Sequence, residues 1–418
     1  MKRRFPRYRD LKEFLTFKPF EIDGVKRRLA SAHTIADIRR IAKARTPSGP
    51  FHYVDGAAED EIAIGRVRAY YRDLEFQPSV LRDVSVNDPG TDLFGRRMRL
   101  PFGFSPTGFT RMMRTEGERA VASVAGRQGI PYALSTMGTT SIADLAEAAP
   151  DAHRWFQLYL WKDRDRSRQF IEIAKKTGYE ALVVTVDVPA GGNRLRDLRN
   201  GMTIPPQLTM KTLIDASYRP HWWFDFLTTE PLRFAFADED AGVTAAELAA
   251  QLYDPAATIE DLPWMREAWG GPLIVKGVQR LDDAKRIADF GVDGIILSNH
   301  GGRQLDRAPI PLRLLPEVAE AVDKRVTVMI DSGITSGGDI VAALARGASF
   351  AWVGRAYLYG LMAGGEAGVT RVVEILETEI VRTMKLLGVQ SIGELNPDHV
   401  RLADEIQARH LQRALSRP

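Results

Sequence analysis

The segment from Gly294 to Asp306 combines a short buried strand with side chains that can do chemistry. Residues 295–297 form an apolar run that ends abruptly at two polar residues. After it come His300, which can accept a proton near neutral pH, and Arg303, which can hold a carboxylate through two parallel hydrogen bonds. The glycines between them, Gly301 and Gly302, allow a tight turn and close approach of a flat ligand. A proton acceptor beside a carboxylate clamp predicts a small acid substrate that loses a proton.

The same residues also allow a simpler interpretation. His300 would then cap a strand, and Arg303 would pair with Asp306 on the surface. The position of the whole group at the end of an apolar strand favours chemistry, because active sites of parallel α/β barrels are built at the carboxyl ends of their strands.

The chain from residue 100 onward alternates buried strands with helical patterns, and each strand ends in a polar or glycine-containing segment. The expected strands are 101–104, 130–134, 155–160, 181–186, 272–275, 292–297, 326–330 and 350–353. Eight such repeats predict an α/β fold of the (β/α)8 TIM-barrel type. An open doubly wound sheet would need a glycine-rich turn after its first strand, and the sequence has none there.

The rest of the chain divides around this barrel. We expect an N-terminal extension over 1–99, with a helix from Thr34 to Lys43 that Thr34 caps. The barrel occupies 100–367, and an insertion at 200–263 interrupts it after the fourth strand. A long amphipathic helix from Gly368 to Leu387 and a tail complete the region 368–418.

The amino-acid composition excludes several classes of function. Fifty-seven basic against 54 acidic residues give a net charge of only +3, so nothing indicates nucleic-acid binding. The absence of cysteine excludes disulfides, thiolate metal sites and cysteine nucleophiles, and we expect no metal site. No apolar run is long enough to span a membrane or to form a signal peptide. A cytoplasmic address is therefore expected, although the basic N-terminal tail could touch an anionic membrane surface.

The sequence Ser298-Asn-His-Gly-Gly-Arg-Gln-Leu-Asp306 resembles the signature of the FMN-dependent family that oxidises L-2-hydroxy acids. The resemblance runs from about Thr34 to about Leu395. It implies an FMN cofactor, oxidation of a small 2-hydroxy acid to the 2-oxo acid with hydride transfer to flavin N5, and often a homotetramer. The insertion and the segment 354–362 look most like those of bacterial respiratory L-lactate dehydrogenases, which pass electrons to quinone or cytochrome.

The resemblance also implies a role for each matching residue. His300 is the catalytic base and Asp187 its partner. Matches to substrate-binding residues are Tyr53, Tyr159, Arg194 and Arg303. Matches to flavin-binding residues are Pro106, Thr107, Gly108, Ser135, Gln157, Thr185, Lys276 and Ser298, where Lys276 would stabilise negative charge on the reduced flavin. Asp331 matches the ribityl ligand, and Gly333, Gly354 and Arg355 match the phosphate site, where barrels commonly bind phosphate.

The chain departs from the family pattern at two positions. Many members carry an arginine where this chain has Thr335, so one positive charge near the phosphate is missing. Glycolate-oxidase-like members usually have alanine where this chain has Gly108. Glycine leaves more room near flavin N5 and weakens the case for a plain oxidase that produces hydrogen peroxide.

The insertion at 200–263 is the variable part of the family. Residues 220–227 and 232–236 are rich in aromatic side chains at no helix or strand period. In relatives this region is either a mobile loop over the site or a segment that touches the membrane. Packing against the barrel or a neighbouring subunit is a third interpretation, and aromatic side chains beside arginines favour a peripheral membrane contact.

Taken together, the residues predict an FMN-dependent L-lactate dehydrogenase or a similar L-2-hydroxy-acid oxidoreductase. Rival hypotheses are an oxygen-using oxidase or lactate monooxygenase with the same site, and a non-redox barrel that binds a sugar phosphate. A protein that binds FMN only to sense or to assemble would not need His300, Asp187, Lys276 and Arg303 together.

Overall fold

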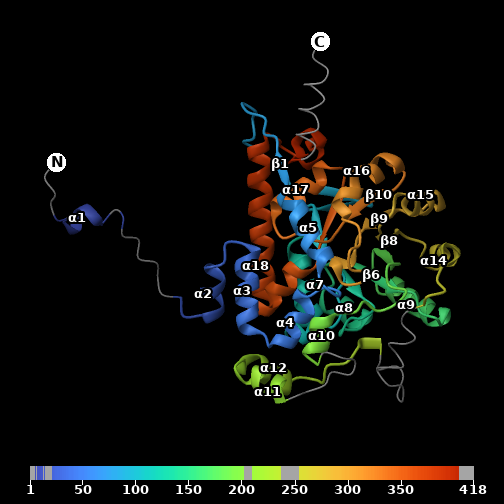
Figure 1. Cartoon of the computed structure of the whole chain (residues 1–418), viewed down its shortest axis with the longest axis horizontal. Helices are drawn as coiled ribbons and strands as arrows, with labels where there is room; N and C mark the ends of the chain where they lie inside the picture. Colours follow the sequence, from blue (N-terminus) through green and yellow to red (C-terminus); the bar gives the residue numbers. More distant parts are fainter. Residues whose placement is uncertain are drawn as a thin grey trace, which may run out of the picture.

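The computed structural model describes residues 5, 7–12, 14, 21–201, 210–236 and 254–403. Much of the basic N-terminal tail, two parts of the insertion and the C-terminal tail therefore lie outside the described residues. A closed barrel of eight parallel strands forms the centre of the molecule, as the sequence predicted (Figure 1).

The barrel strands follow one another in chain order around the ring, and β11 closes the ring against β4. They are β4 (Phe102–Phe104), β5 (Pro131–Ser135), β6 (His153–Tyr159), β7 (Ala181–Thr185), β8 (Leu273–Val278), β9 (Gly294–Leu297), β10 (Thr327–Ile330) and β11 (Phe350–Val353). Each lies within a few residues of its predicted range, because an apolar run between polar ends defines a buried strand in the sequence.

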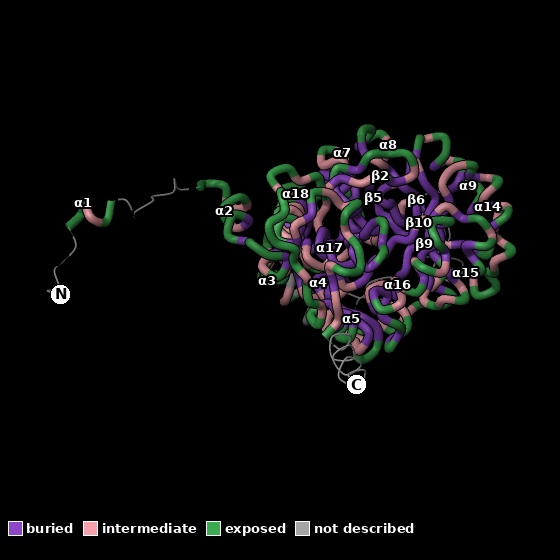
Figure 2. Tube along the Cα trace, turned by 90° about the horizontal axis from the view of Figure 1, so that it is seen from above, coloured by how far each residue is buried: buried purple, intermediate pink, exposed green. Residues whose placement is uncertain are grey.

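The inside of the barrel is a packed core. Trp155 and Trp352 lie against each other there, with ring centroids 4.8 Å apart. A hairpin of β2 (Thr91–Leu93) and β3 (Arg96–Met98) adds Leu93 and Met98 to the same cluster. In Figure 2 the strands form the buried centre, and the exposed residues lie on the outer helices and loops. A filled barrel leaves the carboxyl ends of the strands as the place for a site.

Helices surround the strands. They are α6 (Thr110–Met113), α7 (Gly117–Arg127), α8 (Ile142–Ala148), α9 (Arg164–Lys176), α14 (Leu262–Trp269), α15 (Leu281–Phe290), α16 (Pro311–Val322) and α17 (Gly337–Ala345). Short 3-10 turns lie at η2 (Ile259–Asp261), η3 (His300–Gly302), η4 (Ile392–Glu394) and η5 (Pro397–His399).

The N-terminal extension is helical, with α1 (Tyr8–Leu11), α2 (Gly24–Ala30), α3 (Ile35–Arg45), α4 (Ser48–Asp55) and α5 (Ile62–Arg72). Thr34 caps α3 as predicted, because its side chain accepts a hydrogen bond from the Asp37 amide. After α5, β1 (Leu74–Phe76) pairs with β12 (Val400–Leu402) near the end of the described chain.

The long C-terminal helix begins earlier than predicted. The helix α18 runs from Arg355 to Leu387, and non-helical backbone at Gly364 and Gly365 divides it. Its first part therefore belongs to the last βα unit of the barrel, and its second part is the amphipathic helix expected from Gly368. The division of the chain at residues 367 and 368 stays a prediction.

The insertion contains helices that the sequence analysis did not predict. They are α11 (Met210–Ser217) and α12 (Pro220–Thr228), and the short helix α10 (Leu195–Arg199) lies directly before the insertion. The interpretation of 220–227 as a segment without helical period was wrong. Trp222 and Phe226 lie one turn apart and stack at 4.8 Å, and Trp223 packs on both rings. The polar residues His221, Asp225 and Thr228 recur at i, i+4 and i+7 on one face of the helix, a helical period that the sequence analysis overlooked.

Candidate active site

Most of the predicted site residues line one pocket at the carboxyl ends of the strands. They are Tyr53, Pro106, Thr107, Gly108, Tyr159, Arg194, Lys276, His300, Arg303, Asp331, Gly333, Gly354 and Arg355. The other predicted residues lie within two residues of the carboxyl ends of β5, β6, β7 and β9 and are not part of the pocket lining. They are Ser135, Gln157, Thr185, Asp187 and Ser298.

His300 and Asp187 form a hydrogen-bonded pair. His300 Nδ1 lies 3.1 Å from Asp187 Oδ1, and His300 Nε2 lies 3.5 Å from the Tyr159 hydroxyl. Burial alone would raise the pKa of Asp187, but the adjoining His300 and Lys276 hold it below its ordinary value. Because the carboxylate is ionised at neutral pH, Nδ1 carries the proton of the neutral ring, and Nε2 keeps a lone pair that can accept a proton.

The chain after Lys276 is shaped to make room for Asp187. Gly277 has a φ of +103°, and a Cβ atom on it would lie 2.6 Å from Asp187 Cγ. The pairing between β8 and β9 also shifts register between Lys276 and Val278. A residue other than glycine would displace the carboxylate from His300, so this irregularity in β8 positions the histidine's partner.

Lys276 is buried and held by an ion pair. Its ammonium lies 3.0 Å from Asp331 Oδ2 and donates to Ser298 Oγ, also at 3.0 Å. Burial alone would lower the pKa of Lys276, yet the carboxylates of Asp331 and Asp187 raise it above its ordinary value. The pocket therefore contains a fixed positive charge at neutral pH.

Arg303 and Arg194 lie on the substrate side of the pocket, around Tyr53. Their guanidinium carbons lie 4.7 Å and 5.8 Å from the centre of the Tyr53 ring. Burial lowers the pKa of Arg303, and the charge of Arg194 lowers it further. The simpler pairing of Arg303 with Asp306 was wrong, because Asp306 accepts the backbone N–H of Ala63 at 2.8 Å. Two neighbouring cations in a buried pocket make a place for an anion such as a carboxylate.

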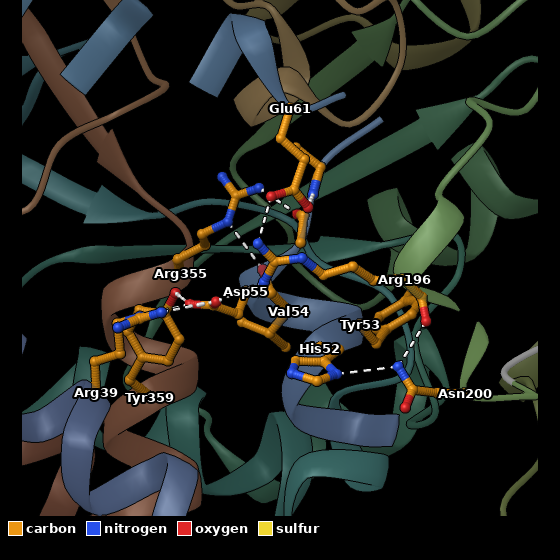
Figure 3. A network of polar contacts seen from close by, with 12 residues as sticks. Arg39, His52, Tyr53, Val54, Asp55, Glu61, Arg196, Asn200, Arg355 and Tyr359 are labelled. Atoms are coloured by element: carbon orange, nitrogen blue, oxygen red, sulfur yellow. Dashed lines mark hydrogen bonds and ion pairs between the residues drawn. The ribbon is translucent and has the colours of Figure 1, made fainter. Parts of the chain in front are cut away.

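The end of α4 is held by a network centred on Asp55 (Figure 3). The buried carboxylate accepts hydrogen bonds from Arg39 Nη2 at 2.8 Å, Arg196 Nη1 at 3.1 Å and the Tyr359 hydroxyl at 2.7 Å. Burial would raise the pKa of Asp55, but these donors keep it well below its ordinary value.

This network places the backbone carbonyls of α4 against the pocket arginines. Arg355 donates to Val54 O at 2.9 Å and to Gly56 O at 2.8 Å, and Arg303 Nη1 donates to Tyr53 O. The segment that carries Tyr53 is thus joined both to the barrel and to the residues that face the pocket.

Replacing Asp55 by asparagine is expected to lower the free energy of unfolding by about 3 kcal/mol, because an arginine pair loses its buried partner. The pKa of Asp55 is lower in the folded chain, so its stabilising contribution is present above pH ~4 and is lost as the pH falls further. Unfolding of the wild-type protein and the Asp55→Asn variant in denaturant should show this difference in stability at pH 7 and a smaller difference in acid. Asp282→Asn, at an exposed carboxylate, is the control, and equal stability of the two variants would contradict the role of the network.

Comparison with known proteins identifies the family of this chain. A family model described as FMN-dependent dehydrogenase matches residues 42–402. The chain belongs to this family. It is 55% identical over 398 residues to a Mycobacterium tuberculosis protein provisionally named an L-lactate dehydrogenase, covering 95% of this chain and 96% of that protein. It is 40% identical over 367 residues to the L-lactate dehydrogenase of Caulobacter vibrioides, covering 86% and 95%.

A solved structure also matches closely. The monotopic membrane protein (S)-mandelate dehydrogenase superposes with a TM-score of 0.85 at 37% identity, over 89% of this chain and 100% of that one. The protein is therefore an FMN-dependent oxidoreductase built on a (β/α)8 barrel.

The pocket of this family member fits FMN. Gln157 Nε2 and Thr185 Oγ1 are buried and have no hydrogen-bond partner among the described residues. Buried polar groups are almost always hydrogen-bonded, so these two atoms require a partner such as the polar edge of a flavin ring. With Lys276 close by on β8, the residues present would hold the ring, and the loops after β10 and β11 would hold the phosphate.

The structure shows the surroundings of Thr335 and Gly108, the two residues that depart from the family pattern. Thr335 donates its backbone N–H and its hydroxyl to Asp339 Oδ2, at 2.8 Å and 3.2 Å. A Cβ atom on Gly108 would lie 2.8 Å from Met137 Cβ. The room that glycine leaves is thus taken up partly by Met137, which also lines the pocket.

Sequence reasoning missed several residues of the pocket. Phe109 lines it and packs on Phe234 of the insertion, with ring centroids 4.0 Å apart. Trp222 of α12 donates to Met112 O at 3.1 Å, which ties the insertion to the pocket helix α6. Ser332 donates to Asp331 and accepts from the amides of Asn299 and Gly301. The aromatic residues of the insertion were noticed, but nothing in their spacing identifies these partners.

Proposed function

We propose that this protein oxidises a small L-2-hydroxy acid, with L-lactate as the first candidate, to the 2-oxo acid. The observation that carries the proposal is the His300–Asp187 pair facing the same pocket as Arg303 and Arg194. A base beside a carboxylate site is what removal of a proton from a hydroxy acid requires. Relatives named L-lactate dehydrogenase support lactate over a larger acid.

The proposed roles follow from the contacts. Arg303, assisted by Tyr53 and Arg194, binds and orients the substrate carboxylate. His300 Nε2 takes the hydroxyl proton, and Asp187 stabilises the imidazolium that results. Tyr159, 3.5 Å from Nε2, donates a hydrogen bond beside the reacting hydroxyl. FMN, when bound, accepts the two electrons, and Lys276 supplies a positive charge to the negative charge that develops there.

We further infer that the electrons pass to a quinone or cytochrome and that the insertion contacts the membrane surface. The helices α11 and α12 and the turn between them expose five large apolar side chains, each more than half exposed: Met210, Ile214, Tyr218, Phe224 and Leu227. Apolar side chains at such a surface suit insertion into a membrane interface. In the described part of the chain, no helix combines the length and the apolar character needed to cross a membrane. A cytoplasmic-face location and a homotetramer, as the resemblance implies, complete the proposal.

The test is anaerobic mixing of the purified protein with L-lactate while the flavin absorbance is followed. We expect rapid bleaching of the flavin, slow recovery of its absorbance in oxygen, and fast recovery when a quinone is supplied in lipid vesicles. We also expect the protein to sediment together with these vesicles. Rapid recovery in oxygen would indicate an oxidase or monooxygenase instead. No bleaching with L-lactate but bleaching with (S)-mandelate would move the substrate to a larger acid, and no bleaching with either would overturn the proposal.

A further inference from the structure

A cation on the N-terminal extension lies in the FMN pocket without a partner. Arg68 of α5 lines the pocket together with Ile64, which is one helical turn away on the same face. Among the described residues, no hydrogen bond or ion pair reaches the Arg68 guanidinium. An arginine that lines a pocket and is not paired with a carboxylate is available to an anionic ligand.

The helix α5 lies directly on the loop that follows β10. A Cβ atom on Gly333 would lie 2.2 Å from Val67 Cγ1 and 3.2 Å from Tyr71 Cε2, so only glycine allows this approach. Val67 and Tyr71 thus pack on the loop that carries Gly333 and Thr335, and Arg68 lies beside them on α5. Because Thr335 also lines the pocket, Arg68 and the phosphate loop face the same space.

Arg68 also lies near the other phosphate-side arginine. Burial lowers the pKa of Arg355 to about 10, and the positive charges of Arg303 and Arg68 act in the same direction. Arg68 and Arg355 also line the same pocket, and two guanidinium groups that face one space favour binding of an anion there. Within the family this end of the pocket is where the FMN phosphate is expected.

The groups already assigned to that phosphate leave its charge unbalanced. A phosphate monoester carries about −1.5 to −2 charges at pH 7. Arg355 spends its Nε and Nη2 donors on the carbonyls of Val54 and Gly56. Thr335 carries no charge, and both of its donors are taken by Asp339. One further cation would bring the positive charge at this site up to that of the dianion.

We propose that Arg68 binds the phosphate of FMN and replaces the arginine that many relatives carry at the position of Thr335. The positive charge has moved from the loop after β10 to the helix that packs on that loop. This inference rests on FMN occupying the pocket as proposed above, and it assigns a cofactor role to the N-terminal extension.

The test separates the phosphate from the rest of the cofactor. Riboflavin has the same ring and ribityl chain but no phosphate, so the full-length protein, stripped of flavin, is titrated with FMN and with riboflavin. Arg68→Gln is expected to raise the Kd for FMN about 10- to 100-fold, the effect of losing a charge-assisted hydrogen bond. The Kd for riboflavin should change less than about two-fold. FMN release from the diluted holoenzyme, followed by flavin fluorescence, should accelerate in parallel.

Two further variants make the test specific. Arg66→Gln, an exposed arginine on the same helix, should leave both Kd values unchanged. Adding Thr335→Arg to Arg68→Gln should restore most of the affinity for FMN, because it returns a cation to the loop. Equal FMN affinity of the Arg68 and Arg66 variants would overturn the proposal. A parallel loss of FMN and riboflavin would also overturn it, since Arg68 would then only support α5. A wild-type protein that binds neither flavin would instead contradict the proposed function itself.

Discussion

Replacing His300 by alanine is expected to lower kcat by about 10²- to 10⁴-fold, the usual contribution of a positioned base, while FMN stays bound. The reason is that proton abstraction and flavin binding use different residues of the pocket. His300 Nδ1 is engaged by Asp187, and Nε2 faces Tyr159. The candidate flavin partners Gln157 and Thr185 lie within β6 and β7, whereas His300 follows β9. The variant should therefore purify with its yellow colour and fail to bleach rapidly when mixed anaerobically with L-lactate.

The companion variants make this result specific. Asp187→Asn should also slow bleaching, because a neutral amide cannot stabilise the imidazolium that forms on proton transfer. His153→Ala is the matched control, since His153 pairs with Glu180 at the opposite end of β6 from Tyr159. We expect wild-type bleaching in the control. Wild-type bleaching in His300→Ala would remove His300 from the mechanism.

The sequence predicted the barrel and its strand-end residues because both depend on local patterns. The runs at 181–184 and 295–297 are apolar throughout, and the polar residues Thr185 and Ser298 follow them at once. Closing a parallel barrel brings all such ends to one face. His300, Lys276 and Asp187 therefore meet even though they come from distant positions in the chain.

The network around Asp55 could not be predicted in the same way. Asp55 contacts Arg196 and Tyr359, which lie 141 and 304 residues further along the chain. No local pattern pairs these side chains, because the contacts depend on how the N-terminal extension docks against the barrel. Arg68 was missed because a helical arginine is usually exposed to solvent. Nothing in the local sequence shows that α5 docks on the loop after β10.

The helix α12 shows how the helical period of a short segment can be overlooked in a sequence. A helix is recognised when apolar side chains gather on one face and polar ones on the other. In Pro220–Thr228 the polar residues His221, Asp225 and Thr228 share one narrow face, and apolar side chains cover the rest. Of these, Phe224 and Leu227 are about 70% exposed. A surface helix whose wide apolar face includes side chains this exposed is unusual for a helix in contact with water alone, and it is what the proposed membrane contact would require.

Replacing Arg303 by lysine is expected to raise KM for L-lactate about 10- to 100-fold with a smaller effect on kcat. A hydrogen bond to a charged group contributes about 1.5–3 kcal/mol, and an ammonium cannot reproduce the two parallel bonds of a guanidinium to a carboxylate. Arg303 is also only partly exposed and lies over the Tyr53 ring, so solvent would not readily replace the lost bond. Steady-state kinetics with L-lactate measure the separation of KM from kcat.

The methyl ester of lactate makes the test sharper, because it keeps the hydroxyl and lacks the carboxylate charge. Wild-type protein should strongly prefer the acid over the ester, and Arg303→Lys should lose most of that preference. Arg286→Lys, at an exposed arginine of α15 paired with Asp283, should retain the wild-type preference. If Arg303→Lys kept both the KM for the acid and the preference over the ester, the carboxylate would have to bind elsewhere. Arg194 would then be the next residue to test, because it is the other guanidinium beside Tyr53.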